Sequence, residues 1–95
     1  MVWMEFIKVQ NARSNVVDLL KNFVTECTKC PGLMDAKVFV HSMIEDCSLC
    51  LHWKTKRLDP QGSSLGLHLC STLKKYGLVD HSVWVENDER EERKS

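Results

Sequence analysis

LMDAKVFVH, at residues 33–41, and CSLCLHWKT, at residues 47–55, are two neighbouring segments in which apolar and polar residues alternate. Alternation with a period of two is typical of a β-strand that has one buried face. The five residues between the segments, SMIED, are few enough for a hairpin connection. If the apolar residues of both strands share the buried face, the register pairs Val40 with Leu49, Val38 with Leu51 and Ala36 with Trp53.

The residues before this hairpin predict a strand and a helix. WMEFIKV, at residues 3–9, is rich in branched and aromatic side chains and predicts a first strand. Residues 16–29 carry apolar side chains at helical spacing, and Asn15 is placed to cap the start of the helix. The PG dipeptide at residues 31–32 ends this helix, because proline cannot continue the hydrogen-bond ladder.

The residues after the hairpin predict a second helix and a last strand. The DP dipeptide at residues 59–60 is a helix-start signal, and Gly77 is a typical C-terminal stop. Gly62 and Gly66 lower the helix propensity by up to about 1 kcal/mol each, so we expect the start of this helix either to be irregular or to lie close to another part of the protein. LVDHSVWVE, at residues 78–86, alternates again and predicts the last strand.

The element order is therefore strand, helix, strand, strand, helix, strand. This β-α-β-β-α-β order is the split β-α-β pattern of a ferredoxin-like α+β fold. In that fold both helices cover one face of a four-stranded antiparallel sheet. Residues 1–86 are expected to form this domain, and NDEREERKS, at residues 87–95, is expected to be a polar C-terminal tail without a face to bury.

The composition describes one small domain and excludes several function classes. Of the 95 residues, 43% are hydrophobic and 27% are charged, which suits a single core. Thirteen Lys and Arg balance thirteen Asp and Glu without a basic stripe, so no nucleic-acid partner is expected. No apolar run approaches the roughly 20 residues of a membrane span, and the first residues do not form a signal peptide. A cytoplasmic protein without a membrane partner is therefore expected.

The face of the predicted sheet that turns away from the helices carries apolar side chains. A single domain would leave this apolar patch in water, so we expect two copies to pair their sheets face to face as a homodimer. The side chains that the hairpin assigns to this face are Phe39, His41, Cys50 and His52. Depending on the register of the outer strands, side chains such as Met4, Phe6 and Trp84 join them.

Several of these features together resemble a known family. They are the PG turn at residues 31–32, the strand with Phe39, the LHWKT segment at residues 51–55 and a second helix with His68. On these features the chain resembles the antibiotic-biosynthesis-monooxygenase type of dimeric α/β barrel proteins over residues 3–86. The resemblance implies a homodimer whose two sheets form a barrel, with a ligand pocket between the helices and the sheet of each subunit.

The resemblance also implies a class of chemistry. Activities in this family include the cofactor-free oxidation of polyphenols to quinones and the degradation of haem. The haem-degrading branch relies on an asparagine in the first strand, and residues 3–9 contain none. The resemblance therefore favours oxidation of an aromatic molecule without a cofactor.

The cysteines offer an alternative from another class of protein. Cys27 with Cys30, and Cys47 with Cys50, form two CxxC units separated by sixteen residues, which is the spacing of a four-cysteine zinc site in a zinc-ribbon-like binding module. The predicted hairpin argues against one shared metal, because it places Cys30 and Cys47 at opposite ends, eight or more residues apart at about 3.3 Å each. We expect reduced thiols, no metal and no cofactor.

Trp53 is the first candidate for a site, because it lies on the helix-facing side at the end of a strand, where an indole can fill core or line a pocket. His68, on the flank of the second helix, is the candidate acid or base beside it. The catalytic candidates are therefore His68 and Trp53. The expected ligand is planar and aromatic, and its predicted binding residues are Trp53, Leu65, Leu69 and Tyr76.

The sequence predicts a small homodimeric, monooxygenase-like protein that acts on or binds a small aromatic or quinone-like molecule without a cofactor. Two alternatives stand beside this hypothesis. One is the zinc-ribbon-like four-cysteine module, and the other is a dimeric ligand-binding protein without catalysis. No Gly-rich phosphate loop, HExxH motif or GxSxG motif is present to support another class of enzyme.

Overall fold

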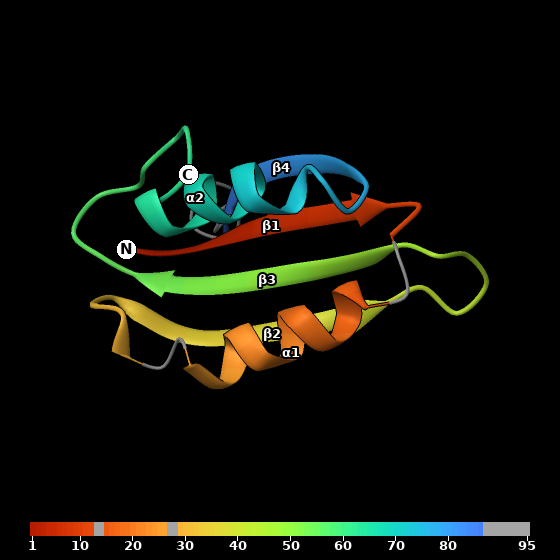
Figure 1. The fold of residues 1–95 in the computed structure, drawn as a ribbon. Helices are drawn as coiled ribbons and strands as arrows, with labels where there is room; N and C mark the ends of the chain where they lie inside the picture. Colours follow the sequence, from red (N-terminus) through yellow and green to blue (C-terminus); the bar gives the residue numbers. More distant parts are fainter. Residues whose placement is uncertain (13–14, 27–28, 87–95) are drawn as a thin grey trace.

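The computed structural model describes residues 1–12, 15–26 and 29–86 (Figure 1). Its element order confirms the ferredoxin-like β-α-β-β-α-β prediction. The elements are β1 (Val2–Gln10), α1 (Val16–Glu26), β2 (Leu33–Val40), β3 (Cys47–Lys54), α2 (Ser64–Leu73) and β4 (Leu78–Val85).

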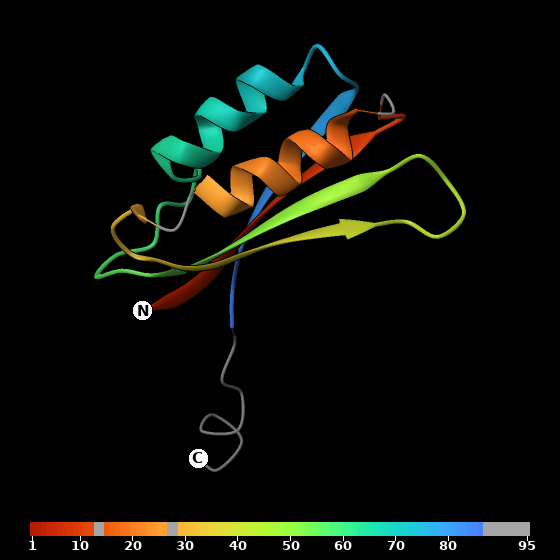
Figure 2. The same cartoon turned by 60° about the horizontal axis from the view of Figure 1, so that its bottom comes forward.

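The four strands form one antiparallel sheet in the order β2-β3-β1-β4. Both helices lie on the same face of this sheet, and within the described residues the other face carries no helix (Figure 2). α1 packs along β2, whereas α2 lies over β1 and β4 (Figure 1). The central strands β1 and β3 are therefore the strands whose side chains reach the helix layer from the middle of the sheet.

The core lies between the sheet and the helices. Buried and more exposed residues alternate along the whole of β1, as expected for a strand with one helix-covered face. The largest fully buried apolar side chains are Trp3, Ile7, Leu20, Leu49, Leu51 and Leu73.

The β2–β3 hairpin has the predicted faces from Ala36 onward but a different register, and a bulge between Leu33 and Asp35 leaves Met34 exposed instead of on the buried face. Val38 pairs with Leu49 and Ala36 with Leu51, so the predicted pairing is wrong by two residues. The connecting loop is the reason. The His41 N–H donates to the Asp46 carbonyl at 3.0 Å and closes the loop early, which shifts the register along both strands. A shift of two residues keeps every side chain on its face, so the alternation of the sequence is equally compatible with both registers.

The start of α2 also differs from the prediction. Residues 59–60 do not begin the helix but lie in a turn in which the Gly62 N–H donates to the Asp59 carbonyl at 2.9 Å. The N-cap is Ser63, in extended conformation, whose hydroxyl accepts from the Gly66 N–H at 2.9 Å. Serine is among the best N-cap residues because its oxygen satisfies one of the unpaired N–H groups of the first turn.

Within residues 1–12, 15–26 and 29–86, neither helix is long and apolar enough to cross a lipid bilayer. The predicted polar tail at residues 87–95 and the predicted last turn of the first helix at residues 27–28 lie outside the described residues.

Candidate functional site

Glu5 is a fully buried carboxylate at the centre of the sheet. It lies on β1 between Trp3 and Ile7, on the face that packs against the helices, and its exposed fraction is 0%. An ionised carboxylate without partners in such a place would cost many kcal/mol, so its hydrogen bonds decide whether the fold tolerates it.

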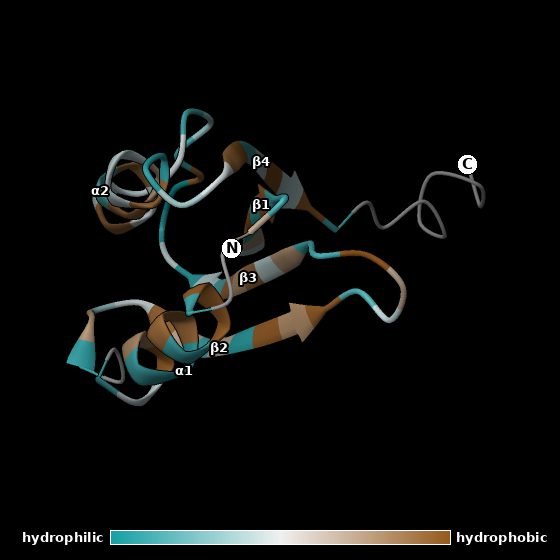
Figure 3. Cartoon of the chain, turned by 45° about the vertical axis from the view of Figure 1, so that its right-hand side comes forward, coloured by the Kyte–Doolittle hydropathy of each residue, from teal (hydrophilic) through white to brown (hydrophobic). Residues whose placement is uncertain are grey.

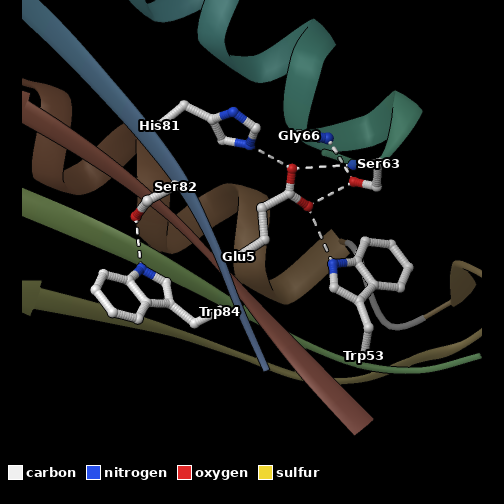
Figure 4. Close-up of polar contacts among 7 residues, drawn as sticks. All are labelled: Glu5, Trp53, Ser63, Gly66, His81, Ser82 and Trp84. Carbon is white, nitrogen blue, oxygen red and sulfur yellow. Dashed lines mark hydrogen bonds and ion pairs between the residues drawn. The ribbon is translucent and has the colours of Figure 1, made fainter. Parts of the chain in front are cut away.

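Four donors converge on the two oxygens of the Glu5 carboxylate (Figure 4). The Trp53 indole N–H donates to Oε1 at 3.1 Å, and the Ser63 hydroxyl donates to the same oxygen at 2.6 Å. The Ser63 backbone N–H donates to Oε2 at 3.1 Å, and His81 Nε2 lies 2.6 Å from Oε2. These partners come from β3, the start of α2 and β4, so the carboxylate connects three elements to β1.

The contact with His81 fixes the tautomer of that histidine. An ionised carboxylate can only accept, so Nε2 carries the proton that points at Oε2. The second ring nitrogen of neutral His81, Nδ1, is then unprotonated and points away from Glu5 (Figure 4). The His81 side chain is 19% exposed whereas the Glu5 side chain is 0% exposed, so the pair reaches the surface through the imidazole.

Two glycines, which have no side chain, make room for the Glu5 carboxylate and the His81 ring. A Cβ atom at Gly66 would lie 1.9 Å from Glu5 Oε2, and a Cβ atom at Gly62 would lie 2.2 Å from Cε1 of His81. Gly62 also has a φ of +102°, which L side chains rarely adopt. These glycines bring the start of α2 into close contact with Glu5 and His81, as expected for a helix start that lies close to another element.

Trp53 is held between a second indole and the carboxylate. Its ring stacks on Trp3 with centroids 5.7 Å apart and an interplanar angle of 18°. The Trp3 indole N–H donates in turn to the Thr55 hydroxyl at 2.8 Å. Trp53 lies on the helix side, as predicted, but it is only 5% exposed, and its polar edge is occupied by Glu5.

The other predicted site residues take different positions. His68 lies on the exposed side of α2, and its backbone carbonyl accepts a hydrogen bond from the Thr72 hydroxyl. Leu69 is buried in the core, and Leu65 and Tyr76 are partly buried against it. The structure brings Trp53 to the carboxylate, and the histidine it places there is His81 rather than His68. The predicted roles in ligand binding and catalysis remain predictions.

Glu5 and His81 were not among the predicted site residues, although the sequence holds a signal for each. Glu5 follows Trp3 and precedes Ile7 in the alternation of β1, so it occupies a position that should be apolar. His81 lies between Val79 and Val83 in the alternation of β4, so it too occupies a position where an apolar residue is expected. A charged residue in the buried register of a central strand needs a partner, and a histidine in the same register is a natural one.

Of the cysteines that the structure describes, Cys30 and Cys47 lie at opposite ends of the β2–β3 hairpin. In the β2–β3 register Cys47 pairs with Val40 beside the hairpin loop, whereas Leu33, next to Cys30, pairs with Trp53 at the far end. Six residues at about 3.3 Å each separate these ends by roughly 20 Å, so one four-cysteine zinc site does not fit the fold. Among the residues that the structure describes, no group of three or more His, Cys, Asp or Glu side chains is arranged to hold a metal ion.

Burial raises the pKa of three of the thiols, and in each case a nearby carboxylate raises it further. Lysine side chains oppose the shift at Cys50 and Cys70. The carboxylates are Asp46 for Cys47, Asp35 for Cys50 and Glu5 for Cys70.

The helix-free face of the sheet is the second feature with functional potential. Trp84 is 58% exposed there, and its indole N–H donates to the Ser82 hydroxyl at 2.8 Å (Figure 4). Phe39 is 52% exposed on the same face at the far edge. A shallow groove between them is lined by Phe6, Lys8, Ser48, Asp80, Ser82 and Trp84.

The hairpin loop extends this apolar surface. Val40, Met43 and Ile44 are all more than half exposed at the hairpin end of β2 and in the loop. Figure 3 shows the hydrophobic colouring of this end of the sheet.

Comparison with known proteins supports the fold and gives no information on the chemistry of the site. The structure is similar to Rv0793 from Mycobacterium tuberculosis, with a TM-score of 0.69 over 94% of this chain and 98% of that chain, at 16% sequence identity. This likeness shows the ferredoxin-like fold alone. No protein-family model and no curated protein sequence matches the chain.

Replacing Gly66 with alanine should destabilise the protein by about 1–3 kcal/mol, because the new methyl group meets the Glu5 carboxylate. Ser71→Ala, at an exposed position of the same helix, is the matched control and should change the free energy of unfolding by less than about 0.5 kcal/mol. Urea denaturation measures both. In a Glu5→Ala background the cost of Gly66→Ala should shrink, and an undiminished cost would contradict the proposed clash.

Cys47, Cys50 and Cys70 should react slowly with iodoacetamide at pH 7.5, because a raised pKa leaves less thiolate, the reactive form. Their labelling should accelerate as the pH rises toward 10. Peptide-resolved mass spectrometry follows each cysteine, with a short cysteine peptide as the reference for an unburied thiol. Labelling at the rate of the peptide at pH 7.5 would show that the burial of these thiols is wrong.

Proposed function

We propose that this protein is a small homodimeric, monooxygenase-like enzyme in which His81, oriented by Glu5, is the general base for a small phenolic or quinone-like molecule. The observation that carries the proposal is the 2.6 Å contact between His81 Nε2 and the fully buried Glu5 carboxylate. A carboxylate on one nitrogen of an imidazole fixes its tautomer and stabilises the imidazolium that forms when the other nitrogen takes a proton.

The proton transfer follows from the assignment of the tautomer. A phenol that binds beside His81 gives its hydroxyl proton to Nδ1, which leaves a phenolate and an imidazolium. Four donors contact the two oxygens of Glu5 and stabilise its negative charge. The positive charge on His81 is then offset by the carboxylate 2.6 Å away.

Removal of the proton prepares the ring for oxidation, because a phenolate gives up electrons more readily than a phenol. Dioxygen is the oxidant in this proposal. One phenol and one dioxygen give one quinone and one water, so one oxygen atom enters the product and the other leaves as water. The chain contributes the base, its orientation and the apolar surroundings, and no cofactor is part of the proposed step.

Trp53 has a supporting place in this proposal. Its indole N–H donates to Glu5 Oε1, and its ring is stacked on Trp3. Trp53 therefore helps to hold the carboxylate that orients His81. The catalytic role given to His68 by the sequence is assigned to His81 in this proposal, because His81 has the carboxylate partner.

The homodimer is the second part of the proposal. Exposed aromatic side chains on the helix-free face, Phe39 and Trp84, favour contact with a second copy. Lys8 and Asp80 line the groove on this face, so each copy offers both signs of charge to its partner. A two-fold arrangement pairs the same surface of both copies and closes after two subunits.

The activity test compares His81→Gln and His68→Gln with the unmodified protein. Oxygen uptake is measured with a panel of dihydroxyaromatic compounds. Loss of a general base typically costs about 10²- to 10⁴-fold in rate, so His81→Gln should lose that much with the best substrate. His68→Gln, at an exposed position, should retain full activity.

Three outcomes would contradict this assignment. Equal loss in both histidine variants would point to a general effect on the protein. Loss in His68→Gln alone would return the role to His68. Binding of a panel compound with no oxygen uptake by the unmodified protein would leave the ligand-binding alternative in place of the enzyme.

The dimer test uses Phe39→Asp, which puts a charge into the proposed contact between sheets. The dimer should dissociate, because burying an unpaired carboxylate in an interface costs several kcal/mol. Leu67→Asp is the matched control, since Leu67 is a similarly exposed apolar residue on the helix layer. Analytical ultracentrifugation measures the mass of each variant, and a monomeric unmodified protein would refute this part of the proposal.

A further inference from the structure

Ser63 has two roles at once at the start of α2. Its hydroxyl oxygen accepts the Gly66 N–H at 2.9 Å, as the N-cap of the helix. The same hydroxyl lies 2.6 Å from Glu5 Oε1 and donates its proton there, because the carboxylate can only accept. The Ser63 side chain and backbone are thus the only link that the hydrogen bonds of the described residues make between the first turn of α2 and the carboxylate.

Hydrogen bonds connect the first turn of α2 to His81 through the Glu5 carboxylate. The Gly66 N–H donates to the Ser63 hydroxyl, this hydroxyl donates to Oε1 of Glu5, and His81 Nε2 donates to Oε2 from the other side. The first two bonds are aligned and polarise one another, which strengthens the bond from Ser63 to the carboxylate. The N-terminal end of a helix also carries a partial positive charge, which favours a carboxylate at that place.

We infer that Ser63 is a positioning residue that sets the base strength of His81 by taking part of the charge of Glu5. This inference rests on the proposed function, because it concerns the same histidine. Ser63 and His81 donate to the two oxygens of one carboxylate, so they compete for its negative charge. Without the hydroxyl, more of that charge acts on His81, and the imidazolium becomes more stable.

Other groups near the carboxylate bear on the same titration. Cys70, on α2, lies close enough to Glu5 for the carboxylate to raise the pKa of its thiol, and Lys74 acts on that thiol in the opposite direction. Cys70 remains a neutral thiol in the range where histidine titrates. Glu5 on β1 and Lys74 on α2 are the charged groups that act on this thiol, and neither is changed in the test.

The experiment follows the titration of His81 by NMR in Ser63→Ala and Ser64→Ala. Ser64 is the exposed next residue and the first residue of α2, so Ser64→Ala controls for a general effect on the helix start. Ser63→Ala should raise the midpoint of His81 by about half a pH unit or more, whereas Ser64→Ala should leave it unchanged. Ser63→Thr, which restores a hydroxyl, should return the midpoint toward that of the unmodified protein.

A second variant guards against loss of the fold. Glycine is tolerated at N-cap positions at a cost of only a few tenths of a kcal/mol relative to serine, so Ser63→Gly removes the hydroxyl and keeps the helix. A His81 midpoint in Ser63→Ala or Ser63→Gly that equals the midpoint in Ser64→Ala, or that falls below it, would overturn the inference.

The NMR titration needs no substrate, so it separates this inference from the proposed function. If no aromatic compound is oxidised but the midpoint shifts, the enzyme proposal fails and the coupling to Ser63 stands. If the enzyme is active and the midpoint does not move, the coupling fails alone. When both hold, the acidic limb of the pH–rate profile should move with the midpoint of His81.

Discussion

The packing of this structure depends on the burial of one charged group, the Glu5 carboxylate. Glu5 lies in the central strand β1 with no exposed surface, and a carboxylate in that position is tolerated only if its oxygens are satisfied. The protein meets this requirement with donors from β3, the start of α2 and β4. The position of α2 over the sheet is therefore fixed by polar contacts at its first turn as well as by the apolar side chains further along it.

The same constraint explains residues that look unfavourable when each is considered alone. Gly66 lowers the helix propensity of α2, yet a Cβ atom there would overlap the carboxylate. Gly62 adopts a positive φ just before Ser63, which allows the chain to turn and present both donors of Ser63 to Glu5. The local cost of the glycines is thus offset by the hydrogen bonds that they permit.

The sequence predicts the fold well because the alternation of side chains is a local property. It assigns the faces of the hairpin strands correctly from Ala36 to Val40 and from Cys47 to Trp53, including the helix-facing position of Trp53. The register of the hairpin is not local in this sense, since a shift of two residues leaves the alternation intact and the loop around His41 decides between the alternatives.

The candidate site could not be predicted from local patterns either. Glu5 and His81 are 76 residues apart in the sequence, and the pairing of β1 with β4 brings them together.

A buried polar network of this kind can serve stability, chemistry or both, and its exposure distinguishes these roles. A network with a purely structural role has no need to reach solvent, because any opening weakens its hydrogen bonds by admitting water. Here Glu5, Ser63 and Trp53 are buried, whereas His81 is partly exposed at one end of the chain of bonds. The group with the accessible edge is also the only histidine of the four, and histidine is the residue type most often used as a general base. The fully buried carboxylate therefore contacts an imidazole that is partly exposed. A base that acts on an external molecule needs such an accessible group.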